Sequence, residues 1–579
     1  MKPIATNSSA GRKTSLCSDL FKQIYRHPIL SAAMLCLLCM IMTTGGVSFL
    51  SAASLAVCIA LAGIGAALHA KSIYEGDKGI RMAVSIGTVA VLTAVIFVYN
   101  VLLRQSYTLV VMNGGLAACV GVFLYLLGAQ KLSTRNILLL LLAAGFIMRV
   151  SYILTMTAGM IQHDVYSLGD GAGHAGYIEY LYANGHLPDF DVREIDQFYH
   201  PPLHHIIAAL WMHLQTLIGV TYAEAYENIQ ILTLFYSTVC LILSYKIFRC
   251  LGLYGGGLLG ATAIIAFCPT FYIMSGSINN DILSITFALG AILNTLYWYR
   301  SRSMKRILAI ALCIGLGMMT KLSVWMVAPA IAFVFIYVFF TNLKDFKKYI
   351  VQFSAFICVC APIGLFWSVR NFLRWQVPFT YVQRLSEKAS QYIGDVPFWQ
   401  RMFDLSPHQF ADVSPQFTMY KNAYNEYNPL IAFFKTSVFD ESIAVRRFPK
   451  IQGFSHVLFF AAVILGLIAF GAMIFMLIKK VKSPDVVQKA FVFLLFTVFL
   501  GMYYSFCFDF PHVCTMNVRY GVPLLVIGAF SYGFLLQHCC TTAKRSAKIG
   551  VITLSSFIAL YALSGFFVYN ICAVSRFGF

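Results

Sequence analysis

Long hydrophobic runs recur along almost the whole chain and are separated by polar connections. A bilayer core about 30 Å thick needs roughly 20 hydrophobic residues per helix, so runs of this length predict membrane-spanning helices. We expect an all-α polytopic membrane protein with about 15 transmembrane helices (range roughly 13–15). The predicted spans are 29–46, 47–69, 80–101, 107–128, 136–160, 229–248, 256–274, 281–298, 306–319, 322–340, 349–369, 454–478, 487–506, 519–537 and 549–570. The run at 306–319 is short and is also consistent with half of a broken helix.

The composition argues against an ordinary soluble protein. Of the 579 residues, 59% are hydrophobic and only 11% are charged, whereas a soluble domain has about 25% charged residues. The first hydrophobic run begins near Pro28, which is too late and too long for a typical cleavable signal peptide. The cysteines lie mostly inside hydrophobic runs, which is typical of small buried hydrophobic residues.

The distribution of basic residues predicts the orientation. The net charge of +19 comes from basic residues in short connections between hydrophobic runs, as in cytoplasmic loops of membrane proteins. We therefore expect no nucleic-acid partner. This pattern predicts a cytoplasmic N-terminus, an odd number of crossings and an outer C-terminus. We also expect a location in the plasma membrane.

Two long connections, 161–228 and 370–453, are both predicted on the outer face. Long polar segments between spans usually carry function. No inner connection is long enough for a nucleotide-binding domain, which argues against a cytosolic nucleotide-sugar enzyme and an ATP-driven pump. The expected domains are accessory helices at 1–130, a catalytic membrane core at 131–540 and a C-terminal helix segment at 541–579.

The first outer connection carries acids, histidines and aromatic residues. A helix is predicted from Gly173 to Asn184, where Asn-Gly gives a stop signal, and an amphipathic helix is predicted at 203–217. Seven of the chain's thirteen histidines lie between 163 and 213. His200, His204 and His205 could contribute metal ligands, but Pro-Pro intervenes and no HExxH pattern is present, so no protein-bound metal is predicted there.

A carboxylate just outside a span can act as a general base on an acceptor hydroxyl. Asp164 and Asp170 are the two candidates in this connection, with Asp170 slightly favoured on spacing. The alternative role is a helix cap or solvated acid for Asp164 and a turn residue among glycines for Asp170.

Further polar residues lie at the outer ends of later spans. Asp281 follows an Asn-Asn turn, where it could bind a divalent cation (Mg²⁺ or Mn²⁺), position the acceptor or cap a helix. Lys321, Arg370 and Arg519 could together bind one phosphate, the lysine as a point charge and the arginines through a planar fork. The alternatives are a snorkelling lysine and interface anchors. Tyr520 follows Arg519 directly.

The order of these motifs resembles the GT-C glycosyltransferases, which include the protein O-mannosyltransferases and the lipid A aminoarabinose transferases. Asp170, His174 and Tyr177 are spaced as in the Asp-Glu-x-x-His-x-x-Tyr loop of these families, although Gly171 replaces the usual glutamate. The segment from His200 to His205 is similar to their Pro-Pro-Leu-Tyr-Tyr element. The resemblance covers roughly 136–537. It implies that a loop aspartate is the base and that His174, Tyr177 and His200 line the substrate site.

The expected reaction is inverting transfer of a sugar from a polyprenyl-phosphate carrier to a glycan, lipid or protein acceptor on the outer face. No resident cofactor is predicted, apart from the optional divalent cation at Asp281. A transporter or flippase is a rival, although such proteins often show internal repeats and charges at mid-membrane, and neither is evident. A lipid-linked glycan polymerase or ligase is a second rival, because 370–453 could bind a growing chain. A metal-dependent membrane hydrolase would require the histidines to bind metal.

Overall fold

A computed structural model describes residues 114–128, 131–158, 165, 169–410, 412–414, 426–440, 451–481 and 483–576. The chain divides into two compact units, residues 1–140 and residues 141–579. The first three predicted spans and the beginning of the fourth lie outside the described residues, as does Asp164. The domain boundaries at 130 and 540 stay predictions.

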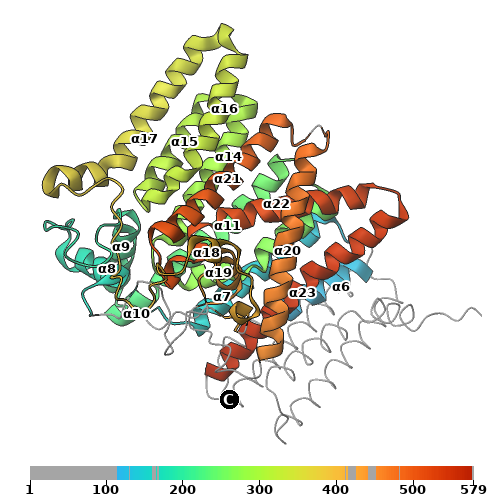
Figure 1. Cartoon of the computed structure of the whole chain (residues 1–579), viewed down its shortest axis with the longest axis horizontal. Coiled ribbons are helices and arrows are strands. Elements are labelled where there is room, and N and C mark those ends of the chain that lie inside the picture. The colour runs from blue at the N-terminus through green and yellow to red at the C-terminus, as the bar shows by residue number, and fades with distance from the viewer. Residues whose placement is uncertain are drawn as a thin grey trace, which may run out of the picture. The chain divides into compact units, whose positions relative to one another are not determined.

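The described part of the chain is helical throughout its regular elements (Figure 1). The α-helices are α6 Gly115–Gly128, α7 Thr134–Thr155, α8 Gly173–Asn184, α9 Leu203–Leu217, α10 Tyr222–Glu227, α11 Ile229–Cys250, α12 Gly255–Ala266, α13 Pro269–Gly276, α14 Asp281–Ser301, α15 Met304–Met318, α16 Ala328–Thr341, α17 Phe346–Trp375, α18 Phe398–Phe403, α19 Pro429–Val438, α20 Gln452–Ile478, α21 Val486–Asp509, α22 Pro523–Thr541 and α23 Arg545–Arg576.

Nine helical segments of the described residues are long and apolar enough to cross a membrane, or ten if one bent pair counts as a span. The prediction of an all-α, multi-pass membrane protein is therefore confirmed. The total of about 15 spans and the side of the membrane that each end faces stay predictions.

Two predicted spans are irregular for local reasons. The span at 256–274 consists of α12 and α13, which meet at a bend of 40°. Pro269 begins α13, and proline cannot donate the backbone hydrogen bond that would continue α12. The short run at 306–319 forms α15, a helix of 15 residues that packs against α14 and α17.

The two helices predicted in the first outer connection are confirmed as α8 and α9. α8 ends where predicted because Gly185 adopts φ 68°, a left-handed conformation, and its backbone N–H donates to Leu181. Glycine takes this conformation without steric cost. α9 buries His204, His205 and Met212, while Leu217 is exposed.

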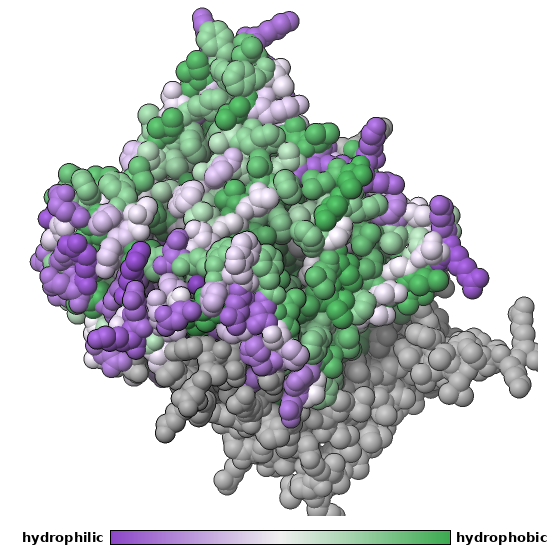
Figure 2. All heavy atoms as spheres, in the orientation of Figure 1, coloured by the Kyte–Doolittle hydropathy of each residue, from purple (hydrophilic) through white to green (hydrophobic). Residues whose placement is uncertain are grey.

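The helices of the second unit pack in two groups that share the long helix α11. α14, α15 and α17 lie side by side in one group, and α12, α20, α22 and α23 form the other (Figure 1). Figure 2 shows hydrophobic residues along the sides of the long helices and hydrophilic residues gathered over α8 and at helix ends. This distribution is the one that a membrane-embedded bundle requires.

Arg149 ties three helices together inside the bundle and was not singled out in the sequence. Its side chain on α7 is fully buried. Nε donates to Ser237 Oγ on α11 at 2.9 Å, and Nη1 donates to the carbonyl oxygens of Gly145 at 2.7 Å and Ala266 at 3.3 Å. Because a buried cation needs partners, this network fixes α7 against α11 and α12.

Gly257 provides a test of the packing between α12 and α22. A Cβ atom at Gly257 would lie 2.5 Å from the carbonyl oxygen of Gly533, so Gly257→Ala must push the two helices apart. We expect a loss of about 1–3 kcal/mol in stability, measured as a lower melting temperature in detergent. The control is Gly471→Ala on α20, where a Cβ meets nothing within 4 Å. Equal melting temperatures for the two variants would contradict the tight contact.

Candidate active site

Three chain segments that are far apart in the sequence meet at one carboxylate. Asp281 is the first residue of α14, Lys321 precedes the 3₁₀ helix Leu322–Val327, and Arg519 lies in the 3₁₀ helix Val518–Tyr520 before α22. Lys321 Nζ forms an ion pair with Asp281 Oδ1, and Arg519 Nη1 lies 3.7 Å from Asp281 Oδ2. The structure thus brings together three of the predicted site residues.

Tyr520 completes this charged cluster of Asp281, Lys321, Arg519 and Tyr520. Arg519 Nη2 donates to Tyr520 Oη at 2.7 Å, and Arg519 Cζ lies 4.8 Å from the ring centroid. Lys321 Nζ lies 5.0 Å from the same centroid. Both cations therefore contact one aromatic ring, an arrangement favoured by the ring quadrupole.

The sequence around each member explains its position. Asn279 Oδ1 accepts a hydrogen bond from the Asp281 backbone N–H at 3.1 Å, which closes the turn before α14. Asn280 Nδ2 donates to the Thr320 carbonyl oxygen at 2.8 Å and so joins this turn to the Thr-Lys segment. A side chain at Gly317 would meet Val324 at 2.6 Å, so this glycine lets α15 turn sharply at Lys321.

The cluster is largely withdrawn from solvent. The side chains of Lys321, Arg519 and Asp281 are 14%, 10% and 3% exposed. Two cations facing one carboxylate leave one net positive charge among these three groups. With little solvent around them, these charges act strongly on any group that lies beside them.

A stack of aromatic and histidine rings lies next to the charged cluster. His174 on α8 is 2% exposed, and its Nδ1 is 2.9 Å from His205 Nε2. The ring of His174 stacks on His200 at 5.3 Å and on His205 at 5.2 Å, measured between centroids. Tyr177 stacks on His205 at 4.4 Å. The predicted residues His174, Tyr177 and His200 therefore belong to one ring stack.

α9 attaches this ring stack to the charged cluster. His204 Nε2 donates to the Ile278 carbonyl oxygen at 2.7 Å, just before the turn that ends at Asp281. The Leu203 backbone N–H donates to the Met319 carbonyl oxygen at 2.9 Å, just before Lys321. His174 is also close enough to Asp281 for their charges to interact.

Burial shapes the titration of the histidines on α9. Burial lowers the pKa of His204 to about 4, and its hydrogen bond to Ile278 and the charge of Asp281 oppose this shift. Burial, with His174 and His204 as neighbours, also lowers the pKa of His205 well below its usual value. Both rings are therefore neutral at pH 7. In the described part of the chain no group of three or more His, Cys, Asp or Glu is placed to hold a metal ion.

Two further predicted residues, Asp170 and Arg370, have other neighbours. Asp170 is exposed in the turn before α8, and its charge acts on Tyr226. The choice between Asp164 and Asp170 as base stays a prediction. Arg370 donates to the Pro188 carbonyl oxygen and lies 4.8 Å from the Trp367 ring and 5.0 Å from the Trp375 ring. The structure therefore places Arg370 against the connection 161–228, and its charge acts on Tyr177 of the ring stack.

A polar cavity of about 70 Å³ adjoins the charged cluster and contains residues that the sequence analysis missed. Asp281 and Arg519 line it together with Tyr152 and Asp440, and Tyr152 Oη donates to Asp440 Oδ2. Asp440 directly follows the hydrophobic helix α19 and one phenylalanine. The same signal, an acid just beyond a hydrophobic segment, drew attention to Asp164 and could have identified Asp440.

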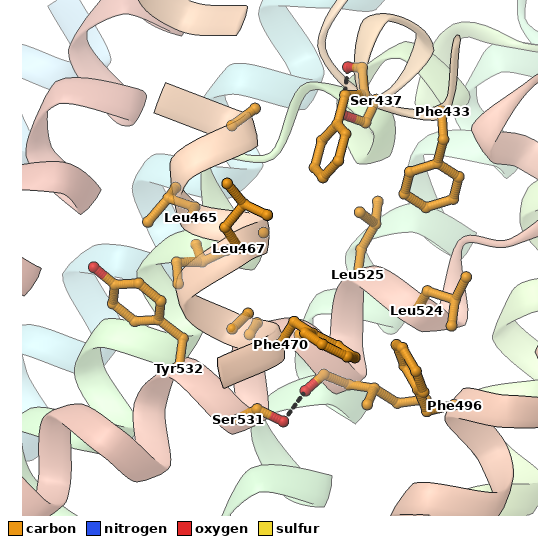
Figure 3. A pocket seen from close by; sticks show the side chains of 18 of the residues that line it. Phe433, Ser437, Leu465, Leu467, Phe470, Phe496, Leu524, Leu525, Ser531 and Tyr532 are labelled. Carbon is orange, nitrogen blue, oxygen red and sulfur yellow. Dashed lines mark hydrogen bonds between the residues drawn. The ribbon is translucent and has the colours of Figure 1, made fainter. Parts of the chain in front are cut away.

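An apolar cavity of about 450 Å³ lies between α19, α20, α21 and α22. Phe433, Leu465, Phe470 and Leu525 are among the side chains that line it (Figure 3). α19 borders both cavities, because Phe433 lines the apolar one and Thr436 the polar one. One short helix therefore contributes residues to the walls of both the apolar cavity and the polar cavity.

The neutral state of His204 gives a pH test of this geometry. The pKa of His204 is about 4 in the folded protein and about 6.5 when unfolded. Only the unfolded state gains a proton as pH falls from 6.5 towards 4, so stability falls over this range by up to about 3 kcal/mol. We expect the melting temperature of His204→Gln to depend less on pH than that of the wild type. The control is His213→Gln, on the exposed side of the same helix. If the melting temperatures of both variants changed equally with pH, the low pKa of His204 would be contradicted.

One family of known proteins matches part of this chain in sequence. Residues 199–367 match the family described as dolichyl-phosphate-mannose-protein mannosyltransferase, a segment that contains His200, Asp281 and Lys321. Among curated proteins, none matches the sequence.

Solved structures of membrane enzymes show a weaker similarity. The oligosaccharyltransferase AglB from Archaeoglobus fulgidus, in complex with an inhibitory peptide and a dolichol-phosphate, has a TM-score of 0.44 and 12% identity over 76% of this chain. The chain spans 56% of the length of that protein. ArnT from Cupriavidus metallidurans has a TM-score of 0.35 and 13% identity over 76% of each chain.

The sequence match covers the turns that carry Asp281 and Lys321, which contact each other in the structure. The resemblance predicted from the motifs is thus confirmed: over residues 199–367, this chain has the sequence pattern of the dolichyl-phosphate-mannose-protein mannosyltransferase family of membrane glycosyltransferases.

Proposed function

We propose that this protein is a membrane glycosyltransferase that moves a sugar from a polyprenyl-phosphate carrier to an acceptor hydroxyl on the extracytoplasmic face of the plasma membrane. The observation that carries this proposal is the convergence of Asp281, Lys321 and Arg519. The family match supports it, because the family is described by a dolichyl-phosphate sugar donor. The acceptor is a glycan, a lipid or a protein.

The charged cluster suits the phosphate of such a carrier. A phosphodiester has one negative charge, and Lys321 and Arg519 are two cations that could face it beside Asp281. Lys321 acts as a point charge and Arg519 offers a planar fork of donors. When the bond between sugar and phosphate breaks, charge grows on the phosphate, and preorganised cations stabilise that charge. The leaving group then needs no proton.

The apolar cavity suits the hydrocarbon tail of the carrier. It is lined by hydrophobic side chains of the membrane-embedded helices α20, α21 and α22 (Figure 3). Because α19 lines both this cavity and the polar cavity, the tail and the phosphate of one carrier would lie at adjacent positions along that helix. Burial of hydrocarbon surface supplies most of the affinity for such a tail.

The first outer connection supplies the base. α8 carries His174 to the edge of the charged cluster, and Asp170 lies four residues earlier in the chain. A base in this connection removes the proton from the acceptor hydroxyl as the oxygen attacks the anomeric carbon. Direct displacement inverts the configuration at that carbon. The proposed reaction needs no divalent cation at Asp281, because Lys321 and Arg519 face the two oxygens of this carboxylate.

Lys321→Ala tests the phosphate site. We expect the variant to bind dolichyl phosphate at least about 10-fold more weakly, because a charge-assisted contact is lost. The measurement is lipid binding to purified protein in detergent, with a melting curve to show that the protein is folded. Lys305→Ala, exposed near the start of α15, is the control. Unchanged affinity in folded Lys321→Ala would count against the phosphate site.

Substitution of the loop acids tests the base. We expect Asp170→Asn or Asp164→Asn to lower the transfer rate by about 10²- to 10⁴-fold without loss of folding. The measurement is sugar transfer from a polyprenyl-phosphate donor by purified protein. Asp189→Asn, an exposed acid of the same connection, should retain activity. If protein with both Asp164 and Asp170 replaced still transferred sugar at the wild-type rate, the base would lie elsewhere.

A further inference from the structure

The polar cavity is built from side chains of several distant segments. Tyr152 comes from the end of α7, Asn279 from the turn before α14, Asp440 from the segment after α19, and Asn517 and Arg519 from the segment before α22. Tyr152 is 6% exposed and Asp440 is 4% exposed. The cavity is therefore an internal polar pocket and not an exposed acidic patch.

The wall that carries Asp440 is held by hydrogen bonds from three directions. Thr270 Oγ1 donates to the Ser437 carbonyl oxygen and Tyr569 Oη donates to the Val438 carbonyl oxygen, both at 2.8 Å. The Val518 backbone N–H donates to Thr436 Oγ1 at 2.8 Å. Because these bonds come from α13, α23 and the segment before α22, the position of Asp440 is fixed before any ligand arrives.

The lining of the cavity matches the chemistry of a sugar. Each sugar hydroxyl both donates and accepts a hydrogen bond. A carboxylate offers strong acceptor oxygens, and an asparagine amide offers both a donor and an acceptor. Asp440, Asn279 and Asn517 therefore supply complementary groups on the cavity wall. Hydrogen bonds to an ionised group are about twice as strong as neutral ones.

The place of the cavity matches the proposed donor. Arg519 belongs to both the charged cluster and the cavity wall. In the donor, the sugar is joined directly to the phosphate. A phosphate held by Arg519 therefore places the attached sugar at this cavity, and a free acceptor does not have this constraint.

We propose that the cavity beside Arg519 binds the sugar of the donor, and that Asp440, oriented by Tyr152, recognises its hydroxyl groups. This inference rests on the proposed function and extends it to the selection of the sugar. Asp440 accepts hydrogen bonds from the sugar, while the Tyr152 hydroxyl holds the carboxylate in place. Tyr152 is thus a positioning residue and Asp440 a specificity residue.

The test compares carriers that differ only in the sugar. Dissociation constants are measured for dolichyl phosphate, dolichyl-phosphate mannose and dolichyl-phosphate glucose on full-length protein in detergent. The readout is the ratio between the two sugar-bearing lipids, because both are phosphodiesters with the same charge and a change of charge near Arg519 acts on both alike. We expect the wild type to bind one of these two lipids more tightly than the other. This preference should fall about 10-fold in Asp440→Asn and about 3- to 10-fold in Tyr152→Phe.

Two control variants carry the same kinds of substitution at positions outside the cavity. Tyr349→Phe removes a buried hydroxyl without a hydrogen-bond partner, and Asp345→Asn removes an exposed acid before α17. Both should keep the wild-type preference. If Asp440→Asn does not fold, the nearly isosteric Tyr152→Phe decides the result.

Three outcomes would overturn the inference. One is a preference that is unchanged in folded Asp440→Asn or Tyr152→Phe, and another is a wild type with no preference for either sugar-bearing lipid. The third is a preference that disappears with a chelator and returns with Mg²⁺, which would assign the carboxylates to a cation. Failure of the proposed function is distinguishable, because Lys321→Ala would then leave the affinity for sugar-free dolichyl phosphate unchanged.

Discussion

The carboxylate of Asp281, held between Lys321 and Arg519, is the interaction on which the rest of the site depends. It joins the beginnings of α14 and α22 and the break after α15. Removing charged groups from water is costly, and a buried pair is stable only with good geometry and further hydrogen bonds. Tyr520 accepts such a bond from Arg519, and Asn279 and Asn280 hold the backbone on either side of the pair. The contacts of Asp281 with Lys321 and Arg519 thus hold the ends of three helices against each other.

The first outer connection is part of the same construction. The start of α9 binds the backbone on both sides of the charged cluster, through His204 to Ile278 and through Leu203 to Met319. The neutral, buried rings of His204 and His205 add no charge at pH 7 to compete with the two cations. The ring stack therefore holds α8 in a fixed position beside the charged cluster. In the proposed reaction, such fixed placement aligns the reactants.

α19 links the chemistry of the second outer connection to the membrane. Its Lys435 is 1% exposed and pairs with Glu426 at 2.6 Å, inside the protein, so this short helix is anchored by charge as well as by hydrophobic packing. Phe433 lines the apolar cavity, and Thr436 lines the polar one. In the proposed reaction, the lipid tail of the carrier occupies the apolar cavity and its sugar-phosphate occupies the adjacent polar site. One bound carrier then fills both.

The sequence by itself determined the features that depend on neighbouring residues. Hydrophobic length predicted spans such as 281–298 and 349–369, because the need to cover about 30 Å of hydrocarbon acts on each segment separately. Asn184-Gly185 predicted the end of α8, because the left-handed turn is a local property of glycine. The motifs also predicted that Lys321, Arg370 and Arg519 bind one phosphate, and the contact of Lys321 and Arg519 with Asp281 was not predicted.

The tertiary structure alone decided which distant side chains meet. Arg370 contacts Pro188 and two tryptophans, whereas Lys321 and Arg519 contact Asp281, and nothing near Arg370 in the sequence predicts its contacts. Tyr152 and Asp440 are separated by most of the chain, yet they form one hydrogen bond in the polar cavity. Such contacts arise from the packing of whole helices, and residue spacing within one segment cannot encode them.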